Sequence, residues 1–195
     1  MNRRIAIRNM ALILGSAVVL PSCLNDKGKP VVQLKHLKIN AEQENLVANL
    51  TETILPKTDT PGAKELGINL FVFKMIDDCM SKDKQEDLLA GLKEFDDAVK
   101  DKYKKSFNEC TVNERTAFVT RLEQQIKAEN DKKKEAGNKD GKDEKGSKLF
   151  SFYQTVKGQT VFGYTTSKYF MTKQIVYELV PGRYNAYFPV KKASA

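Results

Sequence analysis

Apolar residues recur along the chain with the 3.6-residue period of an α-helix. The first such stretch runs from Ala41 to about Ile54, follows a suitable N-cap at Asn40, and ends before Pro56. Its apolar face consists of Leu46, Val47, Leu50 and Ile54. This spacing predicts an amphipathic helix.

A rigid turn over residues 57–63 separates this helix from the next one. Thr60 or Asp59 can act as the N-cap of the second helix, and Pro61 suits its first helical position. The apolar positions that follow are Ile68, Phe71, Val72, Met75, Ile76 and Cys79. Their period predicts the buried face of a second helix, with Cys79 at its end.

Two more helices are predicted in the middle of the chain. Ser81 caps a long amphipathic helix that reaches about Tyr103, and Thr111 with Glu114 forms a capping box that opens another. The pattern then disappears over residues 129–148, a lysine- and acid-rich stretch with three glycines. This composition predicts a flexible charged loop or a frayed helix end.

The C-terminal third begins with helical signal and ends without it. Helical periodicity runs from Lys148 to Phe162, a turn is predicted over residues 163–167, and a short helix follows around 169–176. The tail YELVPGRYNAYFPV has two prolines and four aromatic rings, which is typical of extended chain laid across a surface. We therefore predict an all-α domain over residues 41–195, a single irregular bundle of five or six helices with an extended aromatic C-terminal strap.

The N-terminus has the layout of an export signal over residues 1–22. Basic residues precede an apolar run from Met10 to Leu20, which is too short to span a bilayer. The pair Arg3-Arg4 indicates the twin-arginine route, which carries folded proteins. The alternative is a general secretory signal in which the two arginines occur by chance.

The end of this signal, Leu20-Pro21-Ser22-Cys23, resembles a bacterial lipobox. If the site is used, Cys23 becomes a lipidated N-terminus that tethers the chain to a membrane surface. If it is not used, cleavage falls nearby and the protein is soluble. Residues 23–40 are expected to be a polar tether between this point and the helical domain.

Charge and cysteine content restrict the classes of partner. The formal net charge is +8, but the signal contains three of the arginines, and the remaining lysines are interleaved with acidic residues. A solvated surface explains this pattern better than nucleic-acid binding. Beyond Cys23 only Cys79 and Cys110 remain, and they either form one disulfide in an oxidising compartment or leave Cys79 in the core.

No pattern in the chain predicts a catalytic, cofactor or metal site. The single histidine, His36, has no Cys or His near it and is expected at the surface. The glycine motifs of dinucleotide, phosphate-loop and hydrolase sites are also missing from the sequence. Adjacent helical residues point about 100° apart, so Asp77-Asp78 and Asp96-Asp97 are expected on solvated faces rather than as carboxylate dyads.

Two stretches carry a resemblance to a known family. One is TETILPKTDTPGAK at residues 51–64, and the other is GYTTS at 163–167 followed by YELVPGRY at 177–184. Together with the signal and with Asn-Glu-Arg at 113–115, they resemble the gluconate 2-dehydrogenase subunit 3 family over essentially the whole mature chain.

The resemblance implies a non-catalytic small subunit of an exported dehydrogenase, in the periplasm or tethered to a membrane facing it. The large partner in that family is a glucose–methanol–choline type oxidoreductase that holds FAD and acts on sugars or sugar acids. Electrons pass from it to a cytochrome c subunit or another acceptor. The small subunit is thought to carry the export signal and to stabilise its partner.

Aromatic rings and the TDTPG turn are the candidate contacts with such a partner, because rings are frequent interface anchors. The candidate interface residues are Thr58, Asp59, Thr60, Pro61, Gly62, Tyr164, Pro181, Gly182, Tyr184, Tyr187 and Phe188. The alternatives are that the rings cover the domain's own helices and that the turn only starts a helix.

A second function requires only Cys23 and a groove between helices. It is a membrane-tethered periplasmic lipoprotein that binds a ligand or a polysaccharide. An enzyme acting on its own is a third hypothesis, for which the sequence offers no residues.

Overall fold

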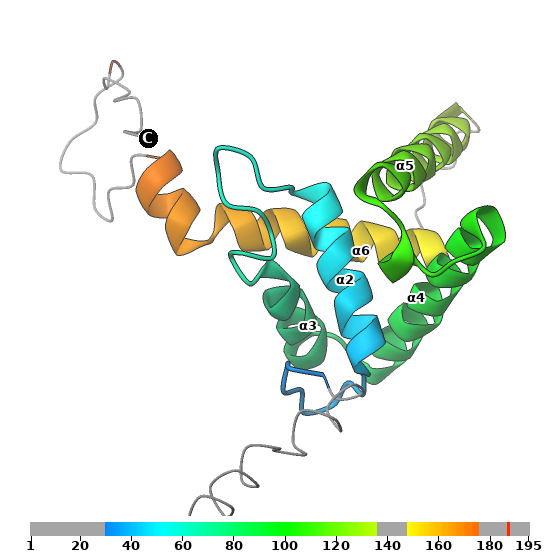
Figure 1. The fold of residues 1–195 in the computed structure, drawn as a ribbon, viewed down its shortest axis with the longest axis horizontal. Coiled ribbons are helices and arrows are strands. Elements are labelled where there is room, and N and C mark those ends of the chain that lie inside the picture. The colour runs from blue at the N-terminus through cyan, green and yellow to red at the C-terminus, as the bar shows by residue number, and fades with distance from the viewer. Residues whose placement is uncertain (1–29, 136–147, 176–186, 188–195) are drawn as a thin grey trace, which may run out of the picture.

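The described part of the protein is built from helices around one core. A computed structural model of the chain describes residues 30–135, 148–175 and 187, and contains no strand within them. The helices are α2 (Ala41–Ile54), α3 (Ile68–Cys79), α4 (Lys82–Tyr103), α5 (Val112–Glu135) and α6 (Lys148–Thr165), with a 3-10 turn η2 (Phe107–Glu109) and a π-helical turn η3 (Phe170–Gln174). The predicted all-α fold is confirmed (Figure 1). The predicted C-terminal strap lies outside the described residues, except for Tyr187.

The predicted N-cap at Asn40 and the predicted capping box at Thr111–Glu114 are confirmed, whereas Ser81 is the N-cap of α4 but makes no side-chain hydrogen bond there. The Asn40 side chain accepts the Gln43 N–H at 2.8 Å, and the Gln43 side chain accepts the Asn40 N–H at 3.0 Å. At the start of α5, the Glu114 carboxylate accepts the Thr111 N–H at 2.7 Å. The Lys105 ammonium and these Thr111 bonds lower the pKa of Glu114 to about 2, so this cap stays ionised at neutral pH.

Of the two predictions for the charged stretch after Glu129, a loop or a frayed helix end, the structure supports the helix end as far as Glu135. Helix α5 continues to Glu135, so residues 129–135 are not part of a loop, and residues 136–147 lie outside the described part. Hydrophobic periodicity identifies a helix through its apolar positions, and residues 129–135 include no apolar residue. Lysine and glutamate are nevertheless good helix formers, which explains why the helix continues.

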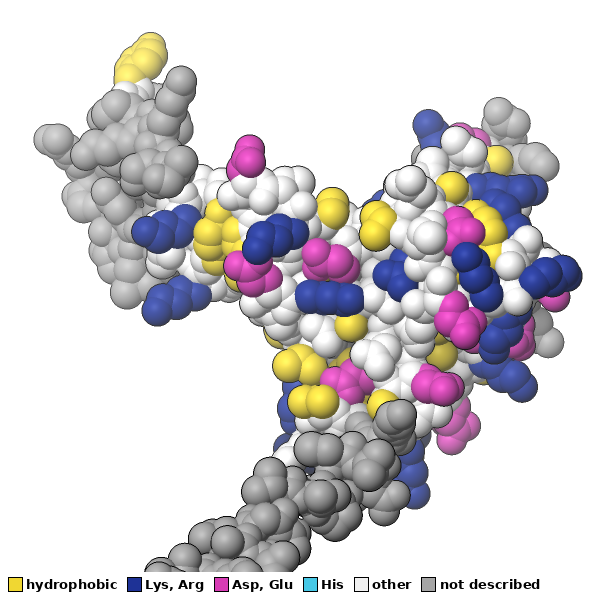
Figure 2. Space-filling view, in the orientation of Figure 1, with side chains coloured by type: hydrophobic (Ala, Val, Ile, Leu, Met, Phe, Trp, Pro, Cys, Tyr) yellow, Lys and Arg dark blue, Asp and Glu magenta, His cyan; other side chains and the backbone are white. Residues whose placement is uncertain are grey.

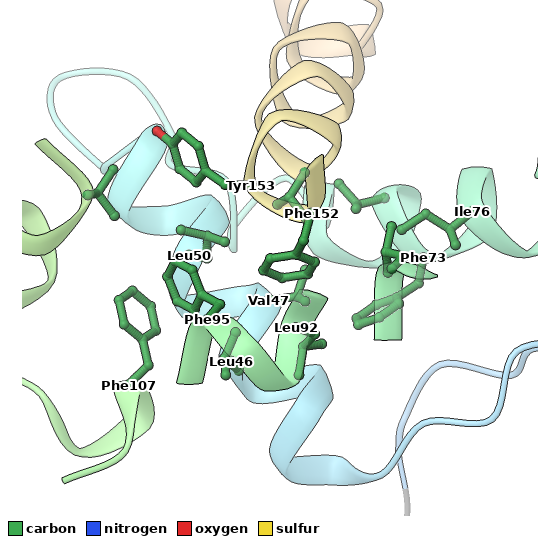
Figure 3. Close-up of a cluster of buried hydrophobic side chains, with 14 of the residues drawn as sticks. Leu46, Val47, Leu50, Phe73, Ile76, Leu92, Phe95, Phe107, Phe152 and Tyr153 are labelled. Atoms are coloured by element: carbon green, nitrogen blue, oxygen red, sulfur yellow. The ribbon is translucent and has the colours of Figure 1, made fainter. Parts of the chain in front are cut away.

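Helix α6 lies at the centre of the bundle and packs most closely against α4. A Cβ placed on Gly91 of α4 would overlap the Lys148 carbonyl oxygen and lie 2.7 Å from the Phe152 Cβ. Only glycine allows this approach. Figure 3 shows side chains from α2, α3, α4, η2 and α6 converging on the resulting core.

Phe95 is the centre of an aromatic cluster in this core. Its ring centroid lies 5.1 Å from that of Phe107, 5.3 Å from Phe118 and 5.7 Å from Phe152. Pairs in such tilted and edge-on geometries contribute about 0.5–1.5 kcal/mol each beyond their burial. The four rings join α4, η2, α5 and α6 into one unit.

The buried face of α3 differs from the predicted one. Phe73 is fully buried, whereas Phe71 and Met75 are half-buried and Cys79 is exposed. The buried residues are Ile68, Val72, Phe73, Ile76 and Asp77. The prediction was wrong here because α3 is apolar on a wide arc, and its packing against both α2 and α6 selects the part of that arc that is buried.

Asp77 holds the segment that precedes α2. Its carboxylate is 2% exposed and accepts three consecutive N–H groups, from Lys35 (2.6 Å), His36 (2.8 Å) and Leu37 (2.7 Å). Burial alone would raise the pKa of Asp77, but these three bonds outweigh it and lower that pKa below its usual range. The expectation of a solvated Asp77 was therefore wrong.

The same contacts change the picture of residues 30–40, which were expected to be part of a tether. Val32 and Leu37 are buried in the core, and the Glu44 carboxylate of α2 accepts the Val31 N–H at 2.5 Å. His36 is exposed, as predicted. This segment is packed onto the domain, and residues 23–29 lie outside the described part of the chain.

Candidate functional site

Glu52 shapes the loop between α2 and α3, which we call the 56–62 loop (residues 56–62). The Glu52 carboxylate, in the last turn of α2, accepts the N–H groups of Lys57 at 3.2 Å and Lys64 at 2.8 Å. A Cβ on Gly62 would lie 2.5 Å from a Glu52 carboxylate oxygen and 2.7 Å from the Lys57 nitrogen. Glycine is therefore required at this position because the carboxylate and the backbone occupy the space.

The 56–62 loop presents polar side chains to solvent. Thr58 and Asp59 are exposed, Thr60 and Pro61 are half-buried, and Gly62 is buried. The Thr58 N–H donates to the Thr60 carbonyl at 3.0 Å, which keeps the tip compact. Within the described part of the chain, no hydrogen bond or ion pair involves the Asp59 side chain.

The predicted helix-capping role of Asp59, Thr60 and Pro61 is wrong. Helix α3 begins only at Ile68, and its N-cap is Gly67 in the left-handed conformation, at φ 66°. Residues 63–67 form a separate turn in which the Leu66 N–H donates to the Gly62 carbonyl at 3.2 Å. Proline was correctly associated with a turn, but that turn closes before the helix starts.

The end of α6 is the second region that contains predicted site residues. Helix α6 continues to Thr165, so the turn predicted from residue 163 begins later. Gly163 is buried under Phe71, whose Cδ1 would lie 2.7 Å from a Cβ at that position. Tyr164 is half-buried, and its ring centroid lies 5.2 Å from that of Phe170.

Apolar side chains are exposed at this same end of α6. Phe162 is 50% exposed and its ring centroid lies 6.0 Å from that of Phe71. Val161, next to Phe162 in the sequence, is 50% exposed, and Leu70, next to Phe71, is 37% exposed. Figure 2 shows a small group of hydrophobic side chains near the end of α6, with charged side chains beside it. We call Leu70, Phe71, Val161 and Phe162 the Phe162 patch.

Sequence reasoning missed the Phe162 patch and Glu52. A signal for the patch exists, because residues 149–165 contain a single charged residue, Lys157, in a chain that is 30% charged. Apolar residues such as Val161 and Phe162, in a stretch with so little charge, are expected to be covered by another surface. No comparable signal marks Glu52, since its role depends on the path of the loop.

Several predicted site residues are not described. Pro181, Gly182, Tyr184 and Phe188 lie outside the described residues, as do Arg3, Arg4 and Cys23 of the signal. Tyr187 is 91% exposed. Among the described residues, the 56–62 loop and the end of α6 are connected through α3, because the loop leads to Ile68 and the Ile68 Cγ2 would lie 3.4 Å from a Cβ on Gly163.

The candidate disulfide between Cys79 and Cys110 is not formed. Both are free thiols, with Cys79 exposed at the end of α3 and Cys110 buried next to η2. Burial is the main reason that the pKa of the Cys110 thiol is raised, which keeps it protonated and unreactive.

Two hollows contain titratable groups, but neither has the character of an active site. A groove of about 1040 Å³ is lined by α2, α4 and η2, and its Asp96 pairs with Lys100 at 2.6 Å and accepts the Phe107 N–H at 2.9 Å. A cavity of about 540 Å³ adjoins Tyr153, which donates to Glu123 at 2.5 Å, while Lys157 also contacts Glu123. Burial and Glu123 raise the pKa of Tyr153, so its phenol stays protonated.

The described residues contain neither a candidate metal site nor a candidate membrane span. Among them, no group of three His, Cys, Asp or Glu side chains is placed to hold a metal ion. No helix in this part is long and apolar enough to cross a membrane.

Comparison with known proteins decides the family. The sequence model described as gluconate 2-dehydrogenase subunit 3 matches residues 41–182, which is well over half of the chain. The chain belongs to this family. Neither a curated protein nor a solved structure matches it significantly.

The range of the family match fits the structure. It begins at the first residue of α2, includes the 56–62 loop and all of α6, and extends beyond the described residues to 182. The resemblance drawn from the TDTPGA and VPGRY stretches is thereby confirmed. Membership of the gluconate 2-dehydrogenase subunit 3 family marks the chain as an accessory subunit of a dehydrogenase complex.

Proposed function

We propose that this chain is the non-catalytic small subunit of an exported FAD-dependent dehydrogenase that acts on sugars or sugar acids. The catalytic partner is a flavoprotein of the glucose–methanol–choline type, and the small subunit stabilises it and carries it out of the cytoplasm. The family match over residues 41–182 is the observation that carries this proposal.

The described surface supports a role in binding another protein. A loop with exposed polar side chains and a helix end with exposed apolar side chains lie at the same end of the molecule, and protein interfaces combine an apolar centre with a polar rim. A partner that binds only the folded state stabilises it by mass action. Small and large subunits would therefore stabilise each other in the complex.

Export of the complex is assigned to the twin arginine at residues 3 and 4. A flavoprotein that has folded around FAD cannot pass through a channel for unfolded chains without losing its cofactor. A small subunit with a twin-arginine signal would take the folded complex across. The complex then works in the periplasm, with a cytochrome c subunit or another acceptor receiving the electrons.

Affinity purification of the tagged full chain from its own cells, grown on sugars, tests the subunit role. A large chain with a flavin absorption spectrum should be recovered together with sugar dehydrogenase activity. Recovery of this chain alone, from cells that contain the activity, would contradict the proposal.

Replacement of both Arg3 and Arg4 by lysine tests the export role separately. Both this chain and the dehydrogenase activity should stay in the cytoplasmic fraction. Normal export of the activity would refute the carrier role but not the stabilising role.

A lipoprotein that binds a ligand or polysaccharide stays the alternative, and the groove between α2 and α4 is its candidate site. That groove is lined mainly by charged and amide side chains and has no aromatic ring, unlike most small-molecule sites. Labelling with a radioactive fatty acid, lost on Cys23→Ala, would show the lipid anchor. Recovery of a flavoprotein partner distinguishes the two functions, because a lipid anchor is compatible with both.

A further inference from the structure

Helix α6 is covered on one side only. Phe152, Tyr153 and Val156 are buried against the other helices, whereas Val161 and Phe162 are each half exposed. Exposed positions earlier in the helix are occupied by polar residues such as Ser151 and Gln154, whereas Val161 and Phe162 are apolar. The end of α6 therefore lacks a cover.

The 56–62 loop adjoins this uncovered end. The loop leads through residues 63–67 into Ile68 at the start of α3, and the Ile68 Cγ2 would lie 3.4 Å from a Cβ on Gly163. Figure 1 shows the loop and the end of α6 at the same end of the molecule. The loop that carries exposed Asp59 and the exposed apolar side chains thus lie at the same end of the molecule.

The composition of this region identifies the kind of partner. The four side chains that define the Phe162 patch are apolar, so we expect the surface that faces them to be apolar as well. Asp59 has no ion-pair partner in the described part of the chain, so a cation can pair with it at the edge. An apolar centre with a charged rim is the arrangement of protein–protein interfaces.

The exposed apolar area is small for a pair of identical chains. A stable interface buries about 800 Å² on each partner, and a homodimer needs a strongly apolar one. The few partly exposed side chains of the Phe162 patch cannot supply that area alone, so the patch is the centre of a larger and mostly polar footprint. Such a footprint fits a different protein better than a second copy.

We propose that the Phe162 patch and the Asp59 edge of the 56–62 loop form the surface that binds the dehydrogenase subunit. The partner presents apolar side chains to Phe162 and an arginine or lysine to Asp59. This inference rests on the proposed function, because it assigns a surface to the partner that the function requires.

Photo-crosslinking from position 162 tests the occupant directly. Phe162 is replaced by p-benzoylphenylalanine in the full chain, which is co-expressed with the large subunit and irradiated. A crosslink to the large subunit is expected. A crosslink to residues 176–195 of the same chain, or to a second copy, would overturn the proposal.

Matched substitutions test the energetics in the same complex. Phe162→Glu and Val161→Glu should each weaken recovery of the large subunit at least about tenfold, as expected for residues at an interface centre. Asp59→Lys should weaken recovery of the large subunit about fivefold and make that recovery less dependent on salt concentration. Val112→Glu is the control, because Val112 is 71% exposed on α5 and lies outside the patch.

The controls separate failure of the surface from failure of the function. All variants should melt within a few degrees of wild type by circular dichroism, since the substituted side chains are half or fully exposed. If wild type recovers the flavoprotein and the Phe162→Glu and Val161→Glu variants recover as much, this surface is wrong and the proposed function stands. If wild type recovers none, the proposed function itself fails.

Discussion

Two segments without regular secondary structure are each held by one carboxylate, but they differ in what surrounds that carboxylate. Asp77 is 2% exposed and fixes residues 35–37, while Val32 and Leu37 of the same segment enter the core. Glu52 is half-buried and fixes both sides of the 56–62 loop, whose tip stays exposed. The first arrangement closes the core, and the second shapes a surface loop.

This difference separates stability from binding. Loss of the buried carboxylate leaves three N–H groups without an acceptor, of which the Leu37 N–H is buried and those of Lys35 and His36 are partly buried, and this costs folding free energy. Loss of the half-buried one leaves N–H groups that water can reach. We therefore expect substitutions at Asp77 to act mainly on stability, and substitutions around Glu52 to act mainly on the shape of the loop and its partner contacts.

The largest effect is expected for Asp77→Ala, which should lower the free energy of unfolding by about 3 kcal/mol because three N–H groups lose their acceptor. Urea denaturation at pH 7 measures it. The matched control is Asp78→Ala, whose carboxylate is exposed and lies 3.7 Å from the Lys35 ammonium. That control should change stability by less than about 0.5 kcal/mol. Equal effects of the two substitutions would remove the distinction between buried and exposed carboxylates.

Gly62→Ala should destabilise the protein by about 2 kcal/mol, because its Cβ would meet the Lys57 backbone nitrogen at 2.7 Å. Gly158→Ala is the control: a Cβ there meets nothing within 4 Å, and the site is inside α6. It should stabilise the helix by about 0.5–1 kcal/mol. In thermal melting, Gly62→Ala should lower the melting temperature and Gly158→Ala should raise it if the loop geometry is correct.

Glu52→Ala should lower stability by only about 1 kcal/mol, since the freed N–H groups can be hydrated. Its clearer effect is faster cleavage by trypsin after Lys57, followed by gel electrophoresis. Glu65→Ala, which removes only the exposed ion pair with Lys57 at 2.9 Å, should be cleaved at the wild-type rate. Combined with Gly62→Ala, Glu52→Ala should cost less than the sum of the two single effects, since the two positions share one contact.

The smallest effect near neutral pH is the contribution of Asp77 to pH dependence. Its pKa is lowered in the folded protein, so its stabilisation is fully present above the unfolded pKa of about 3.9 and is lost as the pH falls through the folded value. Asp77→Asn should therefore make the free energy of unfolding fall less steeply below about pH 4. The slope of that free energy against pH should stay unchanged between pH 7 and 5. A steeper acid slope in the variant than in wild type would contradict this assignment.

Regular helices with local start signals could be predicted from the sequence. Asn40 and the Thr111–Glu114 pair set the starts of α2 and α5 because a cap depends only on residues within one turn. The TDTPGA and VPGRY stretches identified the family for the same reason, since a motif is a local pattern.

Features that depend on distant partners could not be predicted. Asp77 looks like half of a solvated pair until residues 35–37 are placed against it, more than forty positions away for two of its bonds. Asp59 looked like a helix cap because a proline follows soon after, but the chain makes one more turn before α3. In both cases the position of another segment decided the role of the carboxylate.

The close approach of α6 to Gly91 also has a consequence for the order of folding. Phe152 completes the cluster around Phe95, yet it is translated nearly sixty residues later. Contacts between segments so far apart in sequence close large loops, which slows folding. Until α6 is synthesised, the aromatic rings of α4, η2 and α5 lack their contact with Phe152. Exposed rings of this kind make an unfinished chain prone to aggregation, which chaperones prevent.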